Sequence, residues 1–191
     1  NLSVVSFFAK LSVNIVVDQF CHASISDPAS VSSNHHQFFH NDMDHLESIL
    51  FDLSQNTTAT TIICTEGIFS VDGDFGKLAE IVALAKKYKA LILVDEAHSI
   101  GVYGPNGRGV AAEQSVLEEI DFFVITFSKA LASIGGAIVC KPSFKSALEL
   151  IAGPRIFSCA LTPSSTAAVI EALNIIQKPD GELLIQKLKT N

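Results

Sequence analysis

Short runs of apolar residues, with few alternating polar positions, recur along this chain and limit the folds it can adopt. They have the length of β-strands and span residues 14–20, 60–65, 90–94, 122–127 and 136–140. Strands that are apolar throughout, rather than at every second position, are typical of a parallel sheet covered by helices on both faces. The sequence therefore predicts the α/β fold class, with a mostly parallel sheet flanked by helices.

Segments of helical periodicity separate these runs. Leu78, Ile81, Val82 and Ala85 form one apolar face, and Lys86 follows near the end of that segment, where the helix dipole favours positive charge. Further helices are predicted at residues 2–11, 43–53, 144–152, 163–176 and 182–188. A chain of 191 residues, 48% of them hydrophobic, is long enough to bury the core of one compact domain.

The charge balance and the cysteines narrow the possible partners. Because 20 acidic residues outnumber 13 basic ones, giving a net charge of -7, a nucleic-acid partner is not expected. No apolar stretch reaches the ~18 residues that a membrane span needs, so no membrane partner is expected either. The four cysteines form no CxxC pair and predict buried thiols in a reducing, cytoplasmic compartment: Cys21, Cys64, Cys140 and Cys159.

Polar residues follow four of the apolar runs, at the points where the predicted strands end. Ligands of parallel α/β sheets bind beyond the carboxyl ends of the strands, and those ends meet along one edge. These polar positions are therefore expected to face one site: Asp18 and His22, Glu66 and Ser70, Asp95 and His98, and Thr126, Ser128 and Lys129.

Lys129 is the most informative of these residues. Burial disfavours the charged form of a lysine and lowers its pKa, which yields a nucleophilic amine. Such an amine can condense with an aldehyde cofactor, and Asp95 on a neighbouring strand offers a carboxylate to keep a pyridine nitrogen protonated. Thr126 and Ser128, beside a predicted turn into a helix, offer hydroxyl and backbone N–H groups for a phosphate.

The strings that carry these residues resemble the α-oxoamine synthase family of fold type I enzymes, which depend on pyridoxal 5'-phosphate (PLP) and have a class II aminotransferase-like fold. They are HAS at 22–24, TEGIFSVDGD at 65–74, VDEAHSIGVYGPNGRG at 94–109 and TFSKALASIGG at 126–136. Their order as well as their content matches the family, and the resemblance covers nearly the whole chain.

The resemblance implies a role for each candidate site residue. Lys129 would hold PLP as a Schiff base, Asp95 would pair with the pyridinium nitrogen, and His98 would contact the phenolic oxygen of the ring. The remaining contacts would come from Ser70 near the same ring edge, His22 on the ring face and Thr126 at the phosphate.

The resemblance also implies partners and a reaction. Ser158, in the string RIFSCALTPSS, would reach the phosphate of the partner subunit, which implies a homodimer with shared active sites. The family condenses an amino acid with an acyl-CoA thioester and releases coenzyme A and carbon dioxide. The resemblance further implies that residues 1–191 are a partial PLP-binding large domain, without the phosphate-cradling turn before residue 1 and without the small C-terminal domain that carries a substrate-carboxylate arginine.

Within the family, FHNDMDHLES at 39–48 is most similar to the 8-amino-7-oxononanoate synthase branch, which joins alanine to a pimeloyl thioester in biotin synthesis. Three other branches share the same core and stay open: glycine C-acetyltransferase, 5-aminolevulinate synthase and serine palmitoyltransferase. A non-catalytic paralogue or fragment that keeps the fold without the chemistry is the alternative of a different class.

Two other patterns favour simpler interpretations. The DEAH string also occurs in nucleotide-driven helicases, but that function needs a GxxxxGK[ST] phosphate loop, which this sequence lacks. Four histidines lie close together in a polar segment, yet their spacing matches no common metal-ligand pattern, so we expect solvated loop side chains and no metal: His35, His36, His40 and His45.

Overall fold

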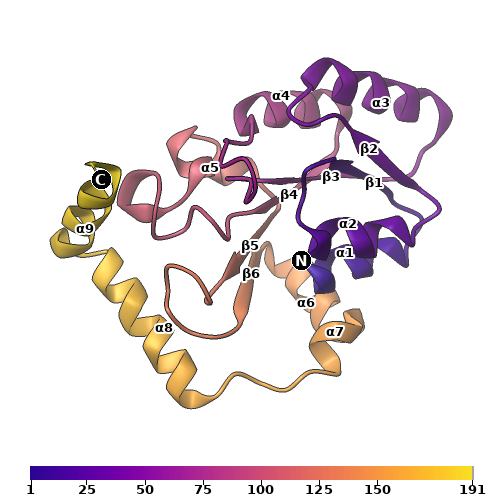
Figure 1. The fold of residues 1–191 in the computed structure, drawn as a ribbon. Coiled ribbons are helices and arrows are strands. Elements are labelled where there is room, and N and C mark those ends of the chain that lie inside the picture. Colours follow the sequence, from indigo (N-terminus) through magenta and orange to yellow (C-terminus); the bar gives the residue numbers. More distant parts are fainter. Residues whose placement is uncertain (191) are drawn as a thin grey trace.

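The computed structural model describes residues 1–190, and its centre is a six-stranded sheet of order β2-β1-β3-β4-β5-β6 (Figure 1). Five strands are parallel, and only β6 runs antiparallel, against β5. The mostly parallel sheet predicted from the sequence is confirmed. The strands are β1 (Asn14–Asp18), β2 (His35–Phe38), β3 (Thr61–Glu66), β4 (Leu91–Asp95), β5 (Phe122–Thr126) and β6 (Gly136–Cys140).

Helices cover both faces of this sheet. The α3 and α4 helices lie over one face together with the short α5, while α1, α2, α6 and α7 lie over the other (Figure 1). The bounds are α1 (Leu2–Ala9), α2 (Ala23–Ser30), α3 (Met43–Asn56), α4 (Leu78–Tyr88), α5 (Val110–Glu113), α6 (Pro142–Ile151) and α7 (Gly153–Ile156), with 3₁₀ turns η1 (Pro105–Gly107) and η2 (Leu117–Glu119).

The apolar strands form these elements because both of their faces are buried. Side chains alternate between the two faces of a strand, so Ile15 and Val17 pack under α1 and α2, whereas Val16 packs under α3 and α4. All five residues of β1 are buried. The two hydrophobic layers hold the sheet rigid and thereby fix the edge at which its carboxyl ends meet.

Two elements differ from the sequence prediction. The strand β2 comes from a polar segment that the sequence predicted as a loop, and it is held at the sheet edge by parallel pairing with β1. The helix α2 was not predicted; it contains Pro28 in its interior and begins directly after His22, whose ring accepts a hydrogen bond from the Ser24 N–H as an N-cap.

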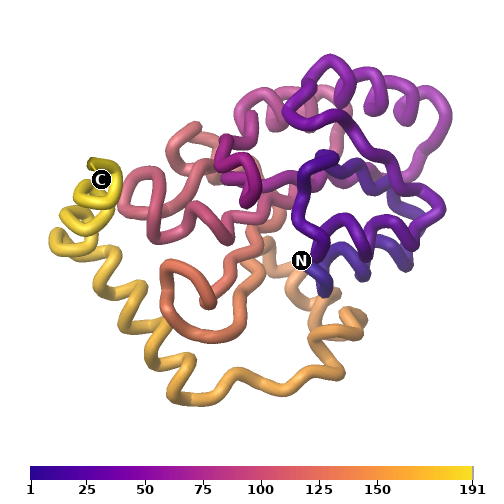
Figure 2. Tube along the Cα trace, in the orientation of Figure 1, coloured from indigo at the N-terminus to yellow at the C-terminus, as the bar shows by residue number. Residues whose placement is uncertain are grey.

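The last two helices run along the outside of the molecule. The α8 helix (Pro163–Ile176) has the bounds predicted from the sequence, and Figures 1 and 2 show it beginning after an extended segment that leads away from α7 and running toward α9 (Pro179–Thr190). The α9 helix begins earlier than predicted, since Pro179 starts its first turn and Gly181 lies inside it. Only Val169 of α8 is buried.

The cysteines are partly as predicted. Cys21 and Cys64 are buried and burial raises the pKa of both thiols, that of Cys64 to about 12. Cys159, however, is exposed, so the expectation that all four thiols are buried was wrong. Among residues 1–190, none of the helices has both the length and the apolar content to cross a membrane.

Candidate active site

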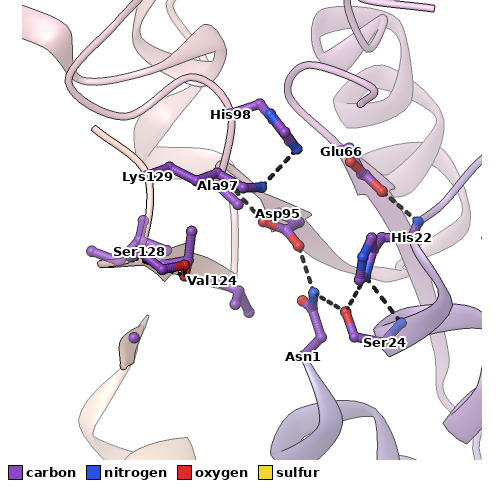
Figure 3. A pocket seen from close by; sticks show the side chains of 13 residues that line it. Asn1, His22, Ser24, Glu66, Asp95, Ala97, His98, Val124, Ser128 and Lys129 are labelled. Carbon is purple, nitrogen blue, oxygen red and sulfur yellow. Dashed lines mark hydrogen bonds between the residues drawn. The ribbon is translucent and has the colours of Figure 1, made fainter. Parts of the chain in front are cut away.

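A cavity of about 380 Å³ opens at the carboxyl ends of the central strands. Figure 3 shows the side chains that line it, which come from the ends of β3, β4 and β5 and from the start of α2. Seven residues predicted to face the site are brought together here: His22, Glu66, Asp95, His98, Thr126, Ser128 and Lys129. The edge on which the sequence placed the polar residues is therefore the edge that holds the cavity.

Lys129 lies in a turn between two strands rather than at the start of a helix. The turn is closed by hydrogen bonds from the Phe127 N–H to the Gly135 carbonyl (2.8 Å) and from the Ser133 N–H to the Phe127 carbonyl (2.8 Å). The chain then returns as β6, so the predicted turn into a helix was wrong. Gly135 has φ +103, a backbone conformation that favours glycine.

The Lys129 amine is close to an imidazole and shares the cavity with carboxylates. Its Nζ atom lies 2.6 Å from Nε2 of His98. Partial burial lowers the pKa of Lys129, while the negative charges of Asp95 and Glu66 oppose that shift. Burial and the nearby Lys129 charge lower the pKa of His98 in turn. A neutral histidine can therefore act as a hydrogen-bond partner of the amine near pH 7.

Asp95 presents its carboxylate to the same cavity from the end of β4. It is 5% exposed. One oxygen accepts a hydrogen bond from the Ala97 N–H (2.8 Å), and the other accepts one from the side-chain amide of Asn1. The first bond belongs to the turn after β4 and fixes the carboxylate in place, so Asp95 is held by its own loop.

Glu96, next in the chain, holds the loop that follows. Its buried carboxylate accepts hydrogen bonds from the N–H groups of Val110 (3.1 Å) and Ala111 (2.9 Å) and from the Ser99 hydroxyl. Burial raises the pKa of Glu96, and these three donors oppose the shift. The Glu96 side chain therefore holds both ends of the loop that carries His98.

His22 projects into the cavity from the N-cap of α2. Its Nδ1 atom lies 2.8 Å from the Ser24 hydroxyl, which also accepts a hydrogen bond from the Asn1 amide (2.8 Å). The His22 backbone N–H donates to Glu66 Oε1 at 2.5 Å. The position of His22 is therefore set by Ser24 in α2 and by Glu66 at the end of β3.

Glu66 lines the cavity, as its place at the end of β3 predicted, although the sequence assigned it no cofactor role. It ends β3 directly beside Asp95 on β4, because the two residues are partners in the parallel register. Burial raises its pKa to about 7, while the His22 N–H hydrogen bond opposes the shift. The signal was present in the sequence, since Glu66 follows the apolar run Ile62–Cys64 with one residue between. Asn1 and Ser24 also line the cavity and were not predicted.

The remaining predicted residues lie at different distances from this cavity. Thr126 is in it, and its hydroxyl lies 2.9 Å from that of Ser128. Ser158 instead lines a second cavity of about 530 Å³, which shares Asn1, Val124, Ile125 and Gly136 with the first. Ser70 is exposed in the loop after β3 and lines neither.

The sequence of this chain is similar to a protein family and to individual known proteins. The family model described as aminotransferase class I and II matches residues 4–191. An 8-amino-7-oxononanoate synthase of Petrotoga mobilis is 38% identical over 192 residues, which cover 100% of this chain and 48% of that protein. A serine palmitoyltransferase of Bacteroides thetaiotaomicron is 43% identical over 184 residues, covering 96% of this chain and 46% of that protein.

The fold of this chain is also similar to that of a solved structure. A variant of serine palmitoyltransferase from S. paucimobilis, with a bound PLP–myriocin adduct, superimposes with a TM-score of 0.87 at 36% identity, covering 93% of this chain and 44% of that one. The chain thus spans about half the length of the curated relatives it matches.

Proposed function

The chain belongs to the class I and II aminotransferase family, and from that premise we propose that it forms the cofactor-binding core of a PLP-dependent α-oxoamine synthase. One observation carries the proposal: the Lys129 amine and the Asp95 carboxylate face the same cavity, with the imidazoles of His22 and His98 beside them. The two relatives described above are named 8-amino-7-oxononanoate synthase and serine palmitoyltransferase, which are α-oxoamine synthase activities.

The groups that line the cavity fit PLP in their chemistry. An aldehyde needs an amine with a lowered pKa, which Lys129 supplies. A pyridine ring needs a fixed carboxylate, and Asp95 is held by the Ala97 N–H. A phosphate needs hydroxyl and N–H donors, for which Thr126 and Ser128 lie side by side.

When bound, PLP supplies an electron sink that stabilises a carbanion at the α-carbon of an amino acid. Asp95 would keep the ring nitrogen protonated. His22 would lie against the ring face, and His98 would donate a hydrogen bond to the phenolic oxygen. Lys129 would hold the cofactor, and its Nζ atom would also be the group that moves a proton at the α-carbon.

The His98 and Lys129 side chains are in hydrogen-bond contact. Because Nζ and Nε2 lie 2.6 Å apart, the amine can donate to the imidazole while its own pKa is lowered by burial. A lysine with a lowered pKa is a better base at pH 7 than an ordinary one. The contact therefore supports the role of Lys129 as the proton-transferring group.

For the substrates, we propose condensation of an amino acid with an acyl thioester, releasing carbon dioxide and the thiol. Two branches are favoured by specific observations. The string at 39–48 and the match to the Petrotoga protein over the whole of this chain favour alanine with a pimeloyl thioester. The higher identity to the Bacteroides protein favours serine with a long-chain acyl thioester. The proposed homodimer would share its active sites through Ser158.

Cofactor binding by the full-length protein tests the core of the proposal. Incubation with PLP should produce the absorbance band of a Schiff base, and borohydride reduction should fix the cofactor covalently on Lys129. Lys129→Ala should lose both, whereas Lys178→Ala, which removes an exposed lysine on the outer surface, should keep both. Labelling of the Lys129→Ala protein at another lysine would disprove the assignment.

A substrate panel then separates the branches. Alanine, glycine and serine are each offered with acetyl, pimeloyl and palmitoyl thioesters, and free thiol is measured. Turnover only with alanine and pimeloyl thioester would support the first branch, and turnover only with serine and palmitoyl thioester the second. Tight PLP binding without thiol release from any pair would instead support a non-catalytic paralogue.

A further inference from the structure

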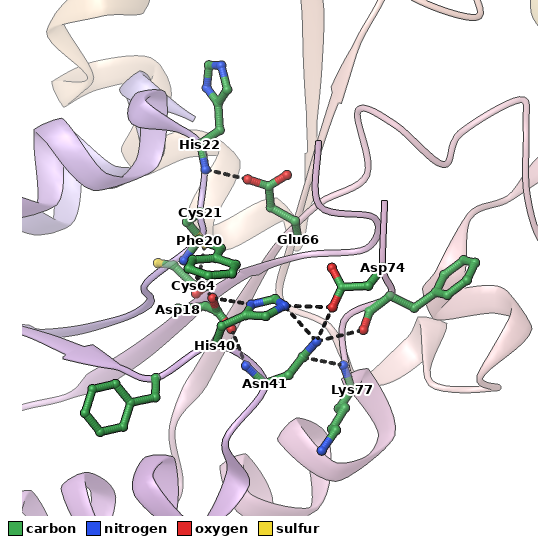
Figure 4. A network of polar contacts seen from close by, with 12 residues as sticks. Asp18, Phe20, Cys21, His22, His40, Asn41, Cys64, Glu66, Asp74 and Lys77 are labelled. Carbon is green, nitrogen blue, oxygen red and sulfur yellow. Dashed lines mark hydrogen bonds and ion pairs between the residues drawn. The ribbon is translucent and has the colours of Figure 1, made fainter. Parts of the chain in front are cut away.

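His40 lies between the loop after β1, which leads to His22 of the candidate active site, and the loop after β3, which begins at Glu66 of the same site, as Figure 4 shows. Its Nδ1 atom is 2.9 Å from Oδ1 of Asp18 at the end of β1, and its Nε2 atom is 2.7 Å from Oδ2 of Asp74 in the loop after β3. The side chain is only 14% exposed. The sequence-based interpretation of His40 as a solvated loop histidine was therefore wrong.

Aromatic side chains from the same two loops enclose the imidazole. The ring of Phe20, which follows Asp18, stacks on it at 4.4 Å between centroids with an interplanar angle of 17°. The ring of Phe69, from the loop after β3, meets it edge-on at 4.4 Å and 85°. His40 is thus joined to each loop by one hydrogen bond and one ring contact.

Each of the two loops carries a predicted cofactor residue. In the first, Asp18 accepts a hydrogen bond from the Phe20 N–H (2.9 Å), and its carbonyl accepts one from the Cys21 N–H (3.0 Å), directly before His22. In the second, the Phe69 N–H donates to the Asp74 carbonyl (3.0 Å), which closes the turn that contains Ser70. Both turns are therefore shaped by carboxylate residues that bind His40.

Asn41 strengthens the same junction. Its backbone N–H donates to the second oxygen of Asp18 (3.0 Å), and its side-chain amide donates to Asp74 (3.1 Å) and to the Phe75 carbonyl (3.0 Å). Its φ of +52 is a left-handed conformation that asparagine tolerates better than most residues. His40 and Asn41 together bind both loops from the end of β2.

We propose that His40 is a positioning residue of the active site, which sets the turn carrying His22 and the turn carrying Ser70 relative to each other. The role rests on the proposed function, since it matters for catalysis only if these turns flank a bound PLP. His40 does not line the cavity; it acts through Asp18, Phe20, Phe69 and Asp74.

The charge of His40 determines how firmly it joins the loops. A neutral imidazole has one N–H, so only the protonated ring can donate to both carboxylates. Burial acts to lower the pKa of His40, but the hydrogen bonds to Asp18 and Asp74 outweigh it, and the pKa is raised. Asp18 and Asp74 are the charged groups that face the ring, while Phe20 and Phe69 cover it with apolar surface.

Amide hydrogen exchange of the full-length protein without PLP tests the coupling. Asp74→Asn removes one charge from the junction and lies on the partly exposed side, so the protein should still fold. We expect about tenfold faster exchange at Phe20, Cys21 and His22, in the loop that Asp74 does not belong to. Asp44→Asn, which removes an exposed carboxylate from the first turn of α3, is the matched control and should leave these amides unchanged. Faster exchange confined to residues 67–77 would overturn the proposal.

A measurement of PLP affinity then tests whether the contacts of His40 with the two loops affect cofactor binding. Asp74→Asn and His40→Gln should each bind PLP about tenfold more weakly and change the visible circular dichroism of bound PLP. The difference between Asp74→Asn and the parent should shrink as the pH rises through the raised pKa of His40. Coupled exchange with unchanged affinity would overturn the positioning role. If the parent itself bound no PLP, the proposed function would fall, while the exchange result would still decide the coupling.

Discussion

The protonation of a single side chain, Glu66, makes the folding stability of this protein depend on pH. Burial raises its pKa from 4.5 to about 7, so the folded protein binds this proton more tightly than the unfolded chain does. The stability that this proton contributes is fully present below pH 4.5 and is lost as the pH rises to 7. An ionised Glu66 above pH 7 thus costs about 3 kcal/mol of folding free energy.

Glu66→Gln should remove that cost. We expect the variant to match the parent at pH 4 and to be more stable by about 3 kcal/mol at pH 8, because a neutral amide oxygen still accepts the His22 N–H. Urea unfolding of the cofactor-free protein at both pH values measures the difference. Glu113→Gln, at an exposed position, should show no such pH dependence. Equal stability of Glu66→Gln and parent at pH 8 would contradict the raised pKa.

Individual site residues could be predicted when a short sequence pattern around them was enough to place them. Lys129, Asp95 and His98 lie in short strings directly after apolar runs, and their shared cavity was foreseen from strand ends alone. Glu66 was expected at this edge of the sheet without a role, and His40 was not foreseen as part of the site region. Their positions depend on the register between strands and on contacts between loops far apart in sequence, which one sequence does not specify.

At the scale of the elements, the turn between β5 and β6 requires a positive φ angle at one residue, Gly135. Gly135 has φ +103, and a Cβ atom there would overlap the side chain of Leu161. Gly135→Ala should cost about 1–3 kcal/mol and weaken PLP binding, because Lys129 lies in this turn. Thermal unfolding and PLP titration measure the two effects. Gly73→Ala serves as comparison, since its φ of +71 imposes strain while open space surrounds it. An equal loss in both variants would show that the Leu161 contact has no effect.

The loop after β4 depends on one buried carboxylate. Glu96→Ala should destabilise the protein by about 3 kcal/mol, because the Val110 and Ala111 N–H groups would lose a charged acceptor. It should also lower turnover, since His98 would lose its support. Glu118→Ala removes an exposed carboxylate nearby and should change neither. Chemical unfolding and steady-state kinetics test both parts; an unchanged unfolding midpoint would contradict them.

The elements that the sequence predicted well are those with strong periodicity. The α8 helix was predicted with its observed bounds, and β3 and β4 to within a residue at each end. The strand β2 was missed because His35, His36 and Gln37 are polar, and pairing with β1 overrides their weak strand preference. The α2 helix was missed because Pro28 usually ends a helix.

At the scale of the whole molecule, stability is unevenly distributed. The strands β1, β3 and β4 are buried between two layers of helices, whereas α8 buries only Val169. Native-state hydrogen exchange should therefore show amides of α8 opening at a free energy several kcal/mol below that of β3. Protection of the α8 amides equal to that of β3 would contradict this, and would indicate that α8 is covered in the full-length protein.

The single antiparallel strand also has a consequence for how the protein assembles. The turn that presents Lys129 is closed by contacts within residues 127–135 and can form as a hairpin, on the order of 1–10 μs. Asp95 reaches its place only when β4 pairs with strands far away in the sequence, which is slower because long chain segments must be closed. On refolding, the amine is then in place before its opposing carboxylate. The rate of PLP capture would measure completion of the parallel sheet rather than formation of the lysine turn.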